Sequence, residues 1–383
     1  MMKVLKVAVI AAALSALSIT TALAAGTIKI GAILAVTGPA SFLGAPEAKT
    51  LETLVEDINA NGGINGSKVE LVIKDSGANP EKAVSFAKQL IEEEKVFAII
   101  GPSTTGETMA IKNIAEEGKT LLLSCAAGEV IVNPVAKYVF KTPQMDRDAV
   151  LRIFQQMKKM GISKIGVLSS NTGFGKAGKE QLEKLAPGAG IQVLISEVYD
   201  KAATDLTAEV TKVKAANVQA LVNWSIEPAQ AIVIKNARQI GMTVPIFQSH
   251  GFGNINYVKT AGAAAEGVIF PAGRLLVADT LSDKTPQKAL LLAYKKAYEA
   301  KYKEDVSTFG GHAYDAMKIL EQALKAAGPG ADKEKVRTTI ENMKGLVGTA
   351  GIFNFSPTDH NGLDSMAFEM LTVKDGKFTV FEK

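Results

Sequence analysis

Small hydroxyl residues and glycines gather in loops that follow short apolar runs of this sequence. Loops of this kind deliver backbone N–H groups and side-chain hydroxyls to the carboxyl ends of parallel strands, where α/β proteins bind ligands. Each one alone is also an ordinary turn or helix cap. Their repetition predicts a binding cleft. The loops are 37–41, 101–106, 124–128, 171–175, 224–227 and 249–252.

One motif indicates a different chemistry. Gly173, Gly175 and Gly178 form a literal G-x-G-x-x-G, and Glu197 follows about 20 residues later, as in dinucleotide-binding units. The motif begins several residues after the apolar run 165–169, which departs from the fingerprint. A nucleotide-dependent oxidoreductase is therefore kept as a remote alternative.

Other catalytic signatures are missing from the sequence. It contains no G-x-S-x-G elbow, and His250, His312 and His360 have no metal-ligand spacing. Cys125 is the only cysteine, so no internal disulfide can form, and no base motif accompanies it. The sequence predicts no catalytic residue, no metal and no cofactor, and hence a binding protein rather than an enzyme.

The elements that position these loops alternate between apolar β-branched runs and amphipathic helices, which is typical of parallel sheets covered by helices on both faces. About 359 residues follow the leader described below, more than one core usually organises, so two lobes are expected. Antiparallel strands are predicted at 352–355, 367–373 and 378–381. The predicted parallel strands are 28–34, 69–74, 98–101, 121–124, 165–169, 192–197, 220–223, 246–248 and 268–270.

The first 24 residues are predicted to be a cleaved export signal. Lys3 and Lys6 precede an apolar run, and Ala22 and Ala24 form a small-residue cleavage pattern. The periplasm is the expected location, where nucleotide cofactors are not reliably supplied. The formal charge of +4 falls to +2 without the two lysines, and the remaining charges alternate in sign. This pattern argues against nucleic-acid binding.

In order and spacing, several short motifs resemble those of the type I periplasmic binding proteins that serve branched-chain amino-acid ABC importers. The resemblance covers essentially the whole chain after the leader. Its main marks are Thr37-Gly38-Pro39, Asn61-Gly62-Gly63, Ile100-Gly101-Pro102, Ala265-Glu266-Gly267 and Ala313-Tyr314-Asp315-Ala316.

The resemblance implies two doubly wound parallel-sheet lobes joined by a three-crossing hinge. The first ligand-binding lobe would comprise 25–142 plus 274–346 and the second 143–273 plus 347–383, with crossings near Pro143, Gly273 and Gly348. Such a protein closes over a small ligand by hinge motion and presents it to an inner-membrane ABC permease. A monomer is expected. A ligand sensor that feeds a membrane receptor is the alternative use of the fold.

The resemblance also assigns residues to the ligand site. Thr105 stands where a hydroxyl binds the ligand carboxylate, and the backbone of Ala126 stands where main-chain groups join it, a combination suited to anion capture. Aromatic contacts are expected from the second lobe and the cleft loops. The full set of candidates is Phe42, Ser103, Thr104, Thr105, Ala126, Ala127, Gly128, Phe174, Trp224, His250 and Phe309.

Two departures from the family pattern change the expected ligand. Amino-acid binders usually have Thr at the position of Gly128 and an acidic residue at that of His250, where it accepts the ligand ammonium. A buried ammonium without a counter-charge loses several kcal/mol of compensation. The sequence therefore favours a small hydrophobic or aromatic carboxylate without an α-amine. Branched-chain amino-acid binding stays open, since Glu227 could replace the missing acid.

Overall fold

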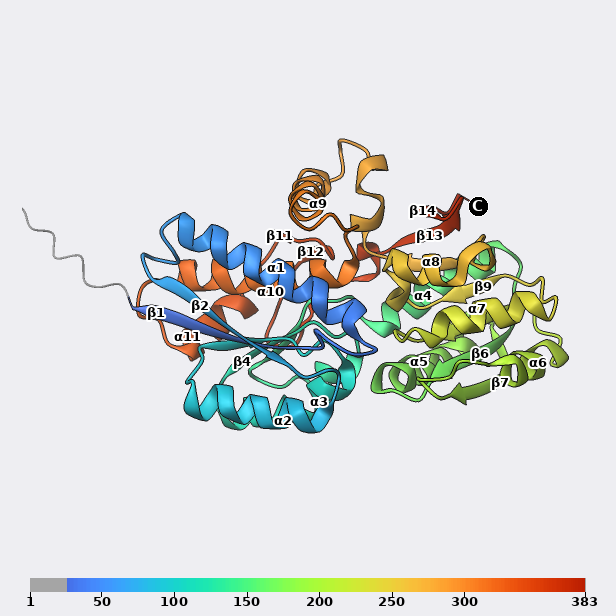
Figure 1. The fold of residues 1–383 in the computed structure, drawn as a ribbon, viewed down its shortest axis with the longest axis horizontal. Helices are drawn as coiled ribbons and strands as arrows, with labels where there is room; N and C mark the ends of the chain where they lie inside the picture. The colour runs from blue at the N-terminus through green and yellow to red at the C-terminus, as the bar shows by residue number, and fades with distance from the viewer. Residues whose placement is uncertain (1–25, 383) are drawn as a thin grey trace, which may run out of the picture.

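The computed structural model describes residues 26–382 and consists of two α/β lobes that lie side by side (Figure 1). Each lobe is built around its own sheet, which is fully parallel in the first lobe and mostly parallel in the second, as the alternating sequence pattern predicts. Among these residues, no helix has the length and apolar character that a membrane span requires.

The first lobe contains a five-stranded parallel sheet in the order β2-β1-β3-β4-β5. All four parallel strands predicted here are confirmed, whereas β5 was missed. The strands are β1 (Thr27–Leu34), β2 (Lys68–Asp75), β3 (Ala98–Ile100), β4 (Leu121–Ser124) and β5 (Val139–Lys141). The helices around it are α1 (Ser41–Ala60), α2 (Pro80–Lys88), α3 (Thr105–Glu117), α10 (Thr308–Ala327) and α11 (Lys333–Glu341).

Alternate residues of these strands face opposite layers of helices because side chains alternate along a strand. Ile33 and Ile99 pack with α2 and α3 on one face. Ile100 and Leu123 pack with α1, α10 and α11 on the other. The near-continuous apolar character of the strands follows from this burial on both faces.

The second lobe contains a seven-stranded sheet in the order β14-β13-β10-β9-β8-β6-β7. All five parallel strands predicted here are confirmed. They are β6 (Lys164–Ser170), β7 (Gln192–Tyr199), β8 (Ala220–Trp224), β9 (Ile246–Gln248) and β10 (Ile269–Ala272). The helices of this half are α4 (Asp146–Lys159), α5 (Gly173–Ala189), α6 (Thr207–Ala215), α7 (Ala229–Gln239) and α8 (Ile255–Ala261), while α9 (Lys288–Tyr302) packs beside the hinge.

The C-terminal strands do not all join one sheet. β13 (Glu369–Lys374) pairs antiparallel with β10, and β14 (Lys377–Val380) pairs with β13. By contrast, β12 (Ile352–Phe353) pairs only with β11 (Leu346–Val347).

This pairing corrects the predicted third crossing. The sequence analysis assigned residues 347–383 to the second lobe, with a crossing near Gly348. Phe353, Phe355 and Leu363 pack instead into the core that contains the first-lobe sheet. The chain returns to the second lobe only where β13 begins, about 20 residues later than predicted.

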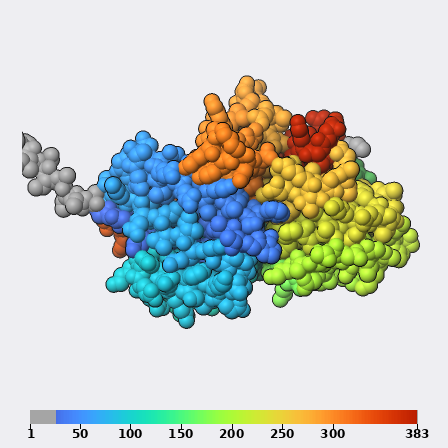
Figure 2. Space-filling model, viewed as in Figure 1, coloured from blue at the N-terminus to red at the C-terminus, as the bar shows by residue number. Residues whose placement is uncertain are grey.

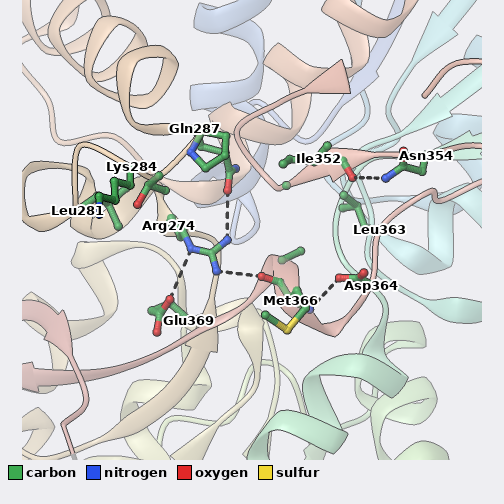
Figure 3. A pocket seen from close by; sticks show the side chains of 14 residues that line it. Arg274, Leu281, Lys284, Gln287, Ile352, Asn354, Leu363, Asp364, Met366 and Glu369 are labelled. Carbon is green, nitrogen blue, oxygen red and sulfur yellow. Dashed lines mark hydrogen bonds and ion pairs between the residues drawn. The ribbon is translucent and has the colours of Figure 1, made fainter. Parts of the chain in front are cut away.

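The hinge is held by side chains that bridge its chain segments. Arg274 donates to the Gln287 side chain at 3.2 Å and to the Met366 carbonyl at 2.9 Å, and it lies 3.4 Å from Glu369. Figure 3 shows these contacts in a pocket at the hinge surface. Gln287 in turn donates to the Gly348 carbonyl at 2.8 Å. Arg274 therefore links the second and third crossings.

The glycines of the G-x-G-x-x-G motif have a packing role in this fold. A Cβ at Gly175 would lie 2.0 Å from the Ser170 carbonyl oxygen, and one at Gly178 would lie 2.0 Å from Trp224 Nε1. Glu197, the acid that completes the fingerprint, forms an ion pair with Lys212 at 3.0 Å. The motif thus allows α5 to lie close against β6 and β8.

Gly178→Ala should therefore destabilise the protein, because the added methyl group would overlap the buried indole of Trp224. Overpacking of this kind costs about 1–3 kcal/mol of unfolding free energy, which urea titration measures. Gly188→Ala is the matched control on the same helix, since a Cβ there has no neighbour within 4 Å. The control should be unchanged or more stable by about 0.5–1 kcal/mol. Equal stability of the Gly178 variant and the parent would contradict this packing.

Candidate ligand-binding site

A small cavity lies between the lobes, at the carboxyl ends of both parallel sheets. The strand order reverses between β1 and β3 in the first lobe and between β6 and β8 in the second. Doubly wound sheets bind ligands at such reversal points. The loops after β3, β4, β6, β8 and β9 all contribute to the cavity. Its lining residues are Leu43, Ser103, Thr105, Cys125, Ala126, Ala127, Pro143, Phe174, Ile226, His250, Gly251, Phe309 and His312.

The lobes are closed on this cavity, and their surfaces touch in Figure 2. Asn254 of the second lobe donates to the Phe42 carbonyl of the first at 3.2 Å. A Cβ at Gly173 would lie 3.0 Å from the backbone nitrogen of Gly106, so the starts of α5 and α3 meet across the cleft. The cavity leaves about 20 Å³ for the centre of a water molecule, room for about one water. A ligand larger than water therefore needs the lobes to lie further apart than they do here.

The first-lobe wall centres on Thr105, the first residue of α3. Its hydroxyl oxygen accepts a hydrogen bond from Gly128 N–H at 3.2 Å, which leaves the hydroxyl proton for another acceptor. A Cβ at Gly128 would lie 2.4 Å from Thr105 Cγ2, so Thr105 occupies the space that a side chain there would need. The first N–H groups of α3 have no partner within the helix, which adds donors for an anion.

Two further groups of this wall already have partners. Ser103 donates its hydroxyl proton to Glu47 and accepts from Ala35 N–H at 3.0 Å. Burial raises the pKa of Glu47 well above its ordinary value, which favours the neutral acid. Ala126 N–H donates to the Ser124 hydroxyl at 3.1 Å. This bond occupies the Ala126 N–H, and the expected contact of the Ala126 backbone with the ligand carboxylate stays a prediction.

The second-lobe wall presents Phe174 and His250. The imidazole lies edge-on to three aromatic rings, with centroid distances of 5.3 Å to Phe174, 5.6 Å to Trp224 and 5.5 Å to Phe368. The Ser249 hydroxyl accepts from Gly251 N–H at 3.1 Å and so fixes the turn that carries His250. Burial lowers the pKa of His250 well below its ordinary value, so the ring is neutral.

A family model described as periplasmic binding protein matches residues 27–377. The chain belongs to this family. The leucine-, isoleucine-, valine-, threonine-, and alanine-binding protein of Pseudomonas aeruginosa is 28% identical over 365 residues, which cover 94% of this chain and 91% of that one.

Solved structures of periplasmic binding proteins agree with this assignment. An extracellular ligand-binding receptor from Rhodopseudomonas palustris has a TM-score of 0.87 at 30% identity, with 94% of this chain and 100% of that chain covered. LivJ of Streptococcus pneumoniae, a branched-chain amino acid transporter substrate binding protein in complex with isoleucine, has a TM-score of 0.80 at 26% identity, covering 92% and 98%. The predicted family and type I fold are confirmed. The predicted leader lies outside the described residues.

Seven of the eleven predicted ligand contacts of this periplasmic binding protein line the cavity: Ser103, Thr105, Ala126, Ala127, Phe174, His250 and Phe309. The sequence reasoning missed the rest of the lining, which is mostly apolar or backbone and carries no motif. These missed residues are Leu43, Cys125, Pro143, Ile226, Gly251 and His312.

The other four predicted contacts lie elsewhere. Phe42 packs edge-on against Tyr257 in an outer groove, with ring centroids 5.3 Å apart. Thr104 caps α3 by accepting from Glu107 N–H at 3.3 Å. Gly128 lies behind Thr105, and Trp224 is fully buried behind Phe174 and His250.

Acidic residues surround the cavity but none lines it. Glu227 accepts from the Ser225 hydroxyl at 2.6 Å and faces an outer groove of the cleft. Asp146, at the start of α4, is fully buried with Oδ1 3.9 Å from His250 Nε2. Within residues 26–382 no group of three or more His, Cys, Asp or Glu side chains could hold a metal ion.

The buried His312 should make the protein acid-sensitive. Burial lowers its pKa to about 3, and the Lys141 ammonium acts in the same direction. The unfolded chain binds this proton from about pH 6.5 downward, so stability is lost as the pH falls from there towards 3. Between about pH 7 and pH 5, His312→Gln should lose about 2 kcal/mol less unfolding free energy than the parent. Urea titrations at both pH values test this, and equal losses would contradict it.

Proposed function

We propose that this periplasmic binding protein captures a small hydrophobic or aromatic carboxylate between its lobes and delivers it to an ABC permease without changing it chemically. The observation that carries the proposal is the composition of the cavity wall. None of its thirteen lining residues is Asp or Glu, whereas one wall presents a hydroxyl proton and the start of a helix. Such a site offsets the cost of burying a carboxylate, but it offers no counter-charge to a buried ammonium.

The carboxylate end of the ligand would lie against α3. The Thr105 hydroxyl can donate to one carboxylate oxygen, and the N–H groups of Thr105 and Gly106, which precede the capped Glu107 N–H, can donate to the other. The positive end of the helix dipole adds to the attraction. Micromolar affinity, equivalent to about 8 kcal/mol, is within reach of these contacts and the burial of an apolar ligand.

The remainder of the ligand would contact apolar side chains. Phe174 and Ile226 come from the second lobe, and Leu43 and Phe309 line the same cavity. Two of these four are aromatic, which suits a flat or branched hydrocarbon group. Contacts from both lobes form only in the closed arrangement, so binding favours closure.

Branched-chain amino-acid capture is the second candidate. The Pseudomonas aeruginosa relative is named for leucine, isoleucine and valine, and the Streptococcus pneumoniae structure is in complex with isoleucine. Asp146 and Glu47 lie one residue layer behind the wall, next to His250 and Ser103. Both stand behind another side chain, which favours the carboxylate without an amine.

A matched pair of ligands decides between the two candidates. Leucine and 4-methylpentanoate have the same hydrocarbon chain and carboxylate, but only leucine carries an ammonium. The thermal midpoint of the protein should rise more with 4-methylpentanoate than with leucine, because ligand binding stabilises the folded state by mass action. A thermal-shift series with benzoate as a third acid measures the order. A larger shift with leucine would favour the amino-acid candidate.

Thr105→Ala should weaken acid binding about tenfold or more, because the ligand carboxylate loses a buried hydroxyl donor. Thr105→Ser keeps the donor and should stay within about threefold of the parent. Isothermal titration with 4-methylpentanoate and benzoate measures both.

Thr211→Ala serves as the control for this experiment, since Thr211 is exposed on α6 and its hydroxyl donates to the Thr207 carbonyl at 2.6 Å. Its affinity should equal that of the parent. Unchanged affinity in Thr105→Ala would mean that the carboxylate binds elsewhere.

A further inference from the structure

Three buried polar atoms meet at the second-lobe side of the cavity without hydrogen-bond partners. Among the described residues, His250 Nδ1, His250 Nε2 and Asp146 Oδ1 are all unpaired. A buried polar group without a partner costs about 1–3 kcal/mol. Only Nε2 and Oδ1 lie near each other, at 3.9 Å, so a shift of less than an ångström would pair them. His250 lines the cavity, and once Nε2 is paired the other ring nitrogen, Nδ1, has no hydrogen-bond partner among the described residues.

Both side chains are held in place. Asp146 Oδ2 accepts from Glu129 N–H at 3.2 Å, and the side chain lies at the positive end of α4. The His250 ring lies among Phe174, Trp224 and Phe368. The two groups are thus anchored from separate elements.

The charged groups around the pair do not bond to it. Lys141 donates to the carbonyls of Pro143 and Gln144 at 2.7 and 3.1 Å. Glu129 and His312 also face the pair, and Asp148 follows on the same helix as Asp146. Burial raises the pKa of Asp146 to about 7, although the Lys141 ammonium opposes this rise.

We infer that Asp146 is a specificity-determining residue that acts through His250, and that the pair recognises a second oxygen, a hydroxyl or a carbonyl, on the captured carboxylate. This inference rests on the proposed function and narrows the ligand class to hydroxy or oxo acids. Asp146 is a positioning residue, because it touches His250 rather than the cavity.

The proton on Asp146 decides which oxygen group fits. An ionised Asp146 accepts Nε2–H, so Nδ1 is an acceptor and needs a hydroxyl donor from the ligand. A protonated Asp146 donates to Nε2, so Nδ1 carries the proton and can donate to a carbonyl. A ligand hydroxyl satisfies both states, whereas a carbonyl satisfies only the second. Preference for an oxo acid should therefore fall as the pH rises through 7.

The test uses 2-oxo-4-methylpentanoate and 4-methylpentanoate, which differ only by the second oxygen. The ratio of their affinities, measured by isothermal titration, cancels general repulsion between Asp146 and any anion. In the parent the oxo acid should bind about tenfold tighter at about pH 6, and this preference should be lost at about pH 8. 2-Hydroxy-4-methylpentanoate should keep its preference at both pH values.

Asp146→Asn supplies a readout that structural damage would not produce. Its amide can still accept from Glu129 N–H and can donate to His250 Nε2 at any pH, like the protonated acid. At about pH 8 this variant should bind the oxo acid about tenfold tighter than the parent, with no difference at about pH 6. Lys158→Gln is the control, since Lys158 is exposed near the other end of the same helix, and it should behave as the parent. His250→Phe should abolish the oxo preference at both pH values.

The outcomes separate the two proposals. An oxo preference that depends neither on pH nor on Asp146→Asn would overturn this inference and leave the capture of acids intact. Absence of binding by all three acids to the parent would overturn the proposed function, and this inference with it.

Discussion

Buried hydrogen bonds at the hinge join the first two chain crossings to one loop of the first lobe, residues 348–350. Asp315 accepts from Thr349 and Ala350 N–H at 2.6 and 2.8 Å, which fixes the loop 348–350 against α10. Gln144, beside the first crossing, donates to the Ala350 carbonyl at 2.8 Å, and Gln287 donates to the same loop. One loop therefore serves as a common pivot. The cleft can open around it while both sheet cores stay intact.

Closure of the cleft costs free energy because it buries polar groups that have no hydrogen-bond partner. His250, His312 and Asp146 each bury at least one atom that has no partner in the described part of the chain. Water can satisfy such atoms while the lobes are apart, but the closed cavity has little room for it. A ligand that brings the missing donors and acceptors removes this cost, so its chemistry determines how stable the closed form is.

The sequence predicts the parts of this protein that depend on local pattern. All nine predicted parallel strands are present because each is a short apolar run, whereas β5 was missed because its short run ends in Lys141, a charged residue that the fold buries. The third crossing was placed too early, because Phe353 and Phe355 pack into the first-lobe core with residues distant in sequence, such as Phe140. In the site, the loops were predictable but the approach of Asp146 to His250 was not. Asp146 begins α4 and His250 follows β9, and no sequence motif links these two elements.

The single tryptophan of the chain lies one layer behind the ligand cavity. Its indole is fully buried, contacts Phe174 and His250, and is pressed against the backbone of Gly178. Any rearrangement of the two wall residues changes the surroundings of this one chromophore. Intrinsic fluorescence at equilibrium and in stopped flow can thus follow events in the cleft, with no label attached and no second indole to obscure the signal.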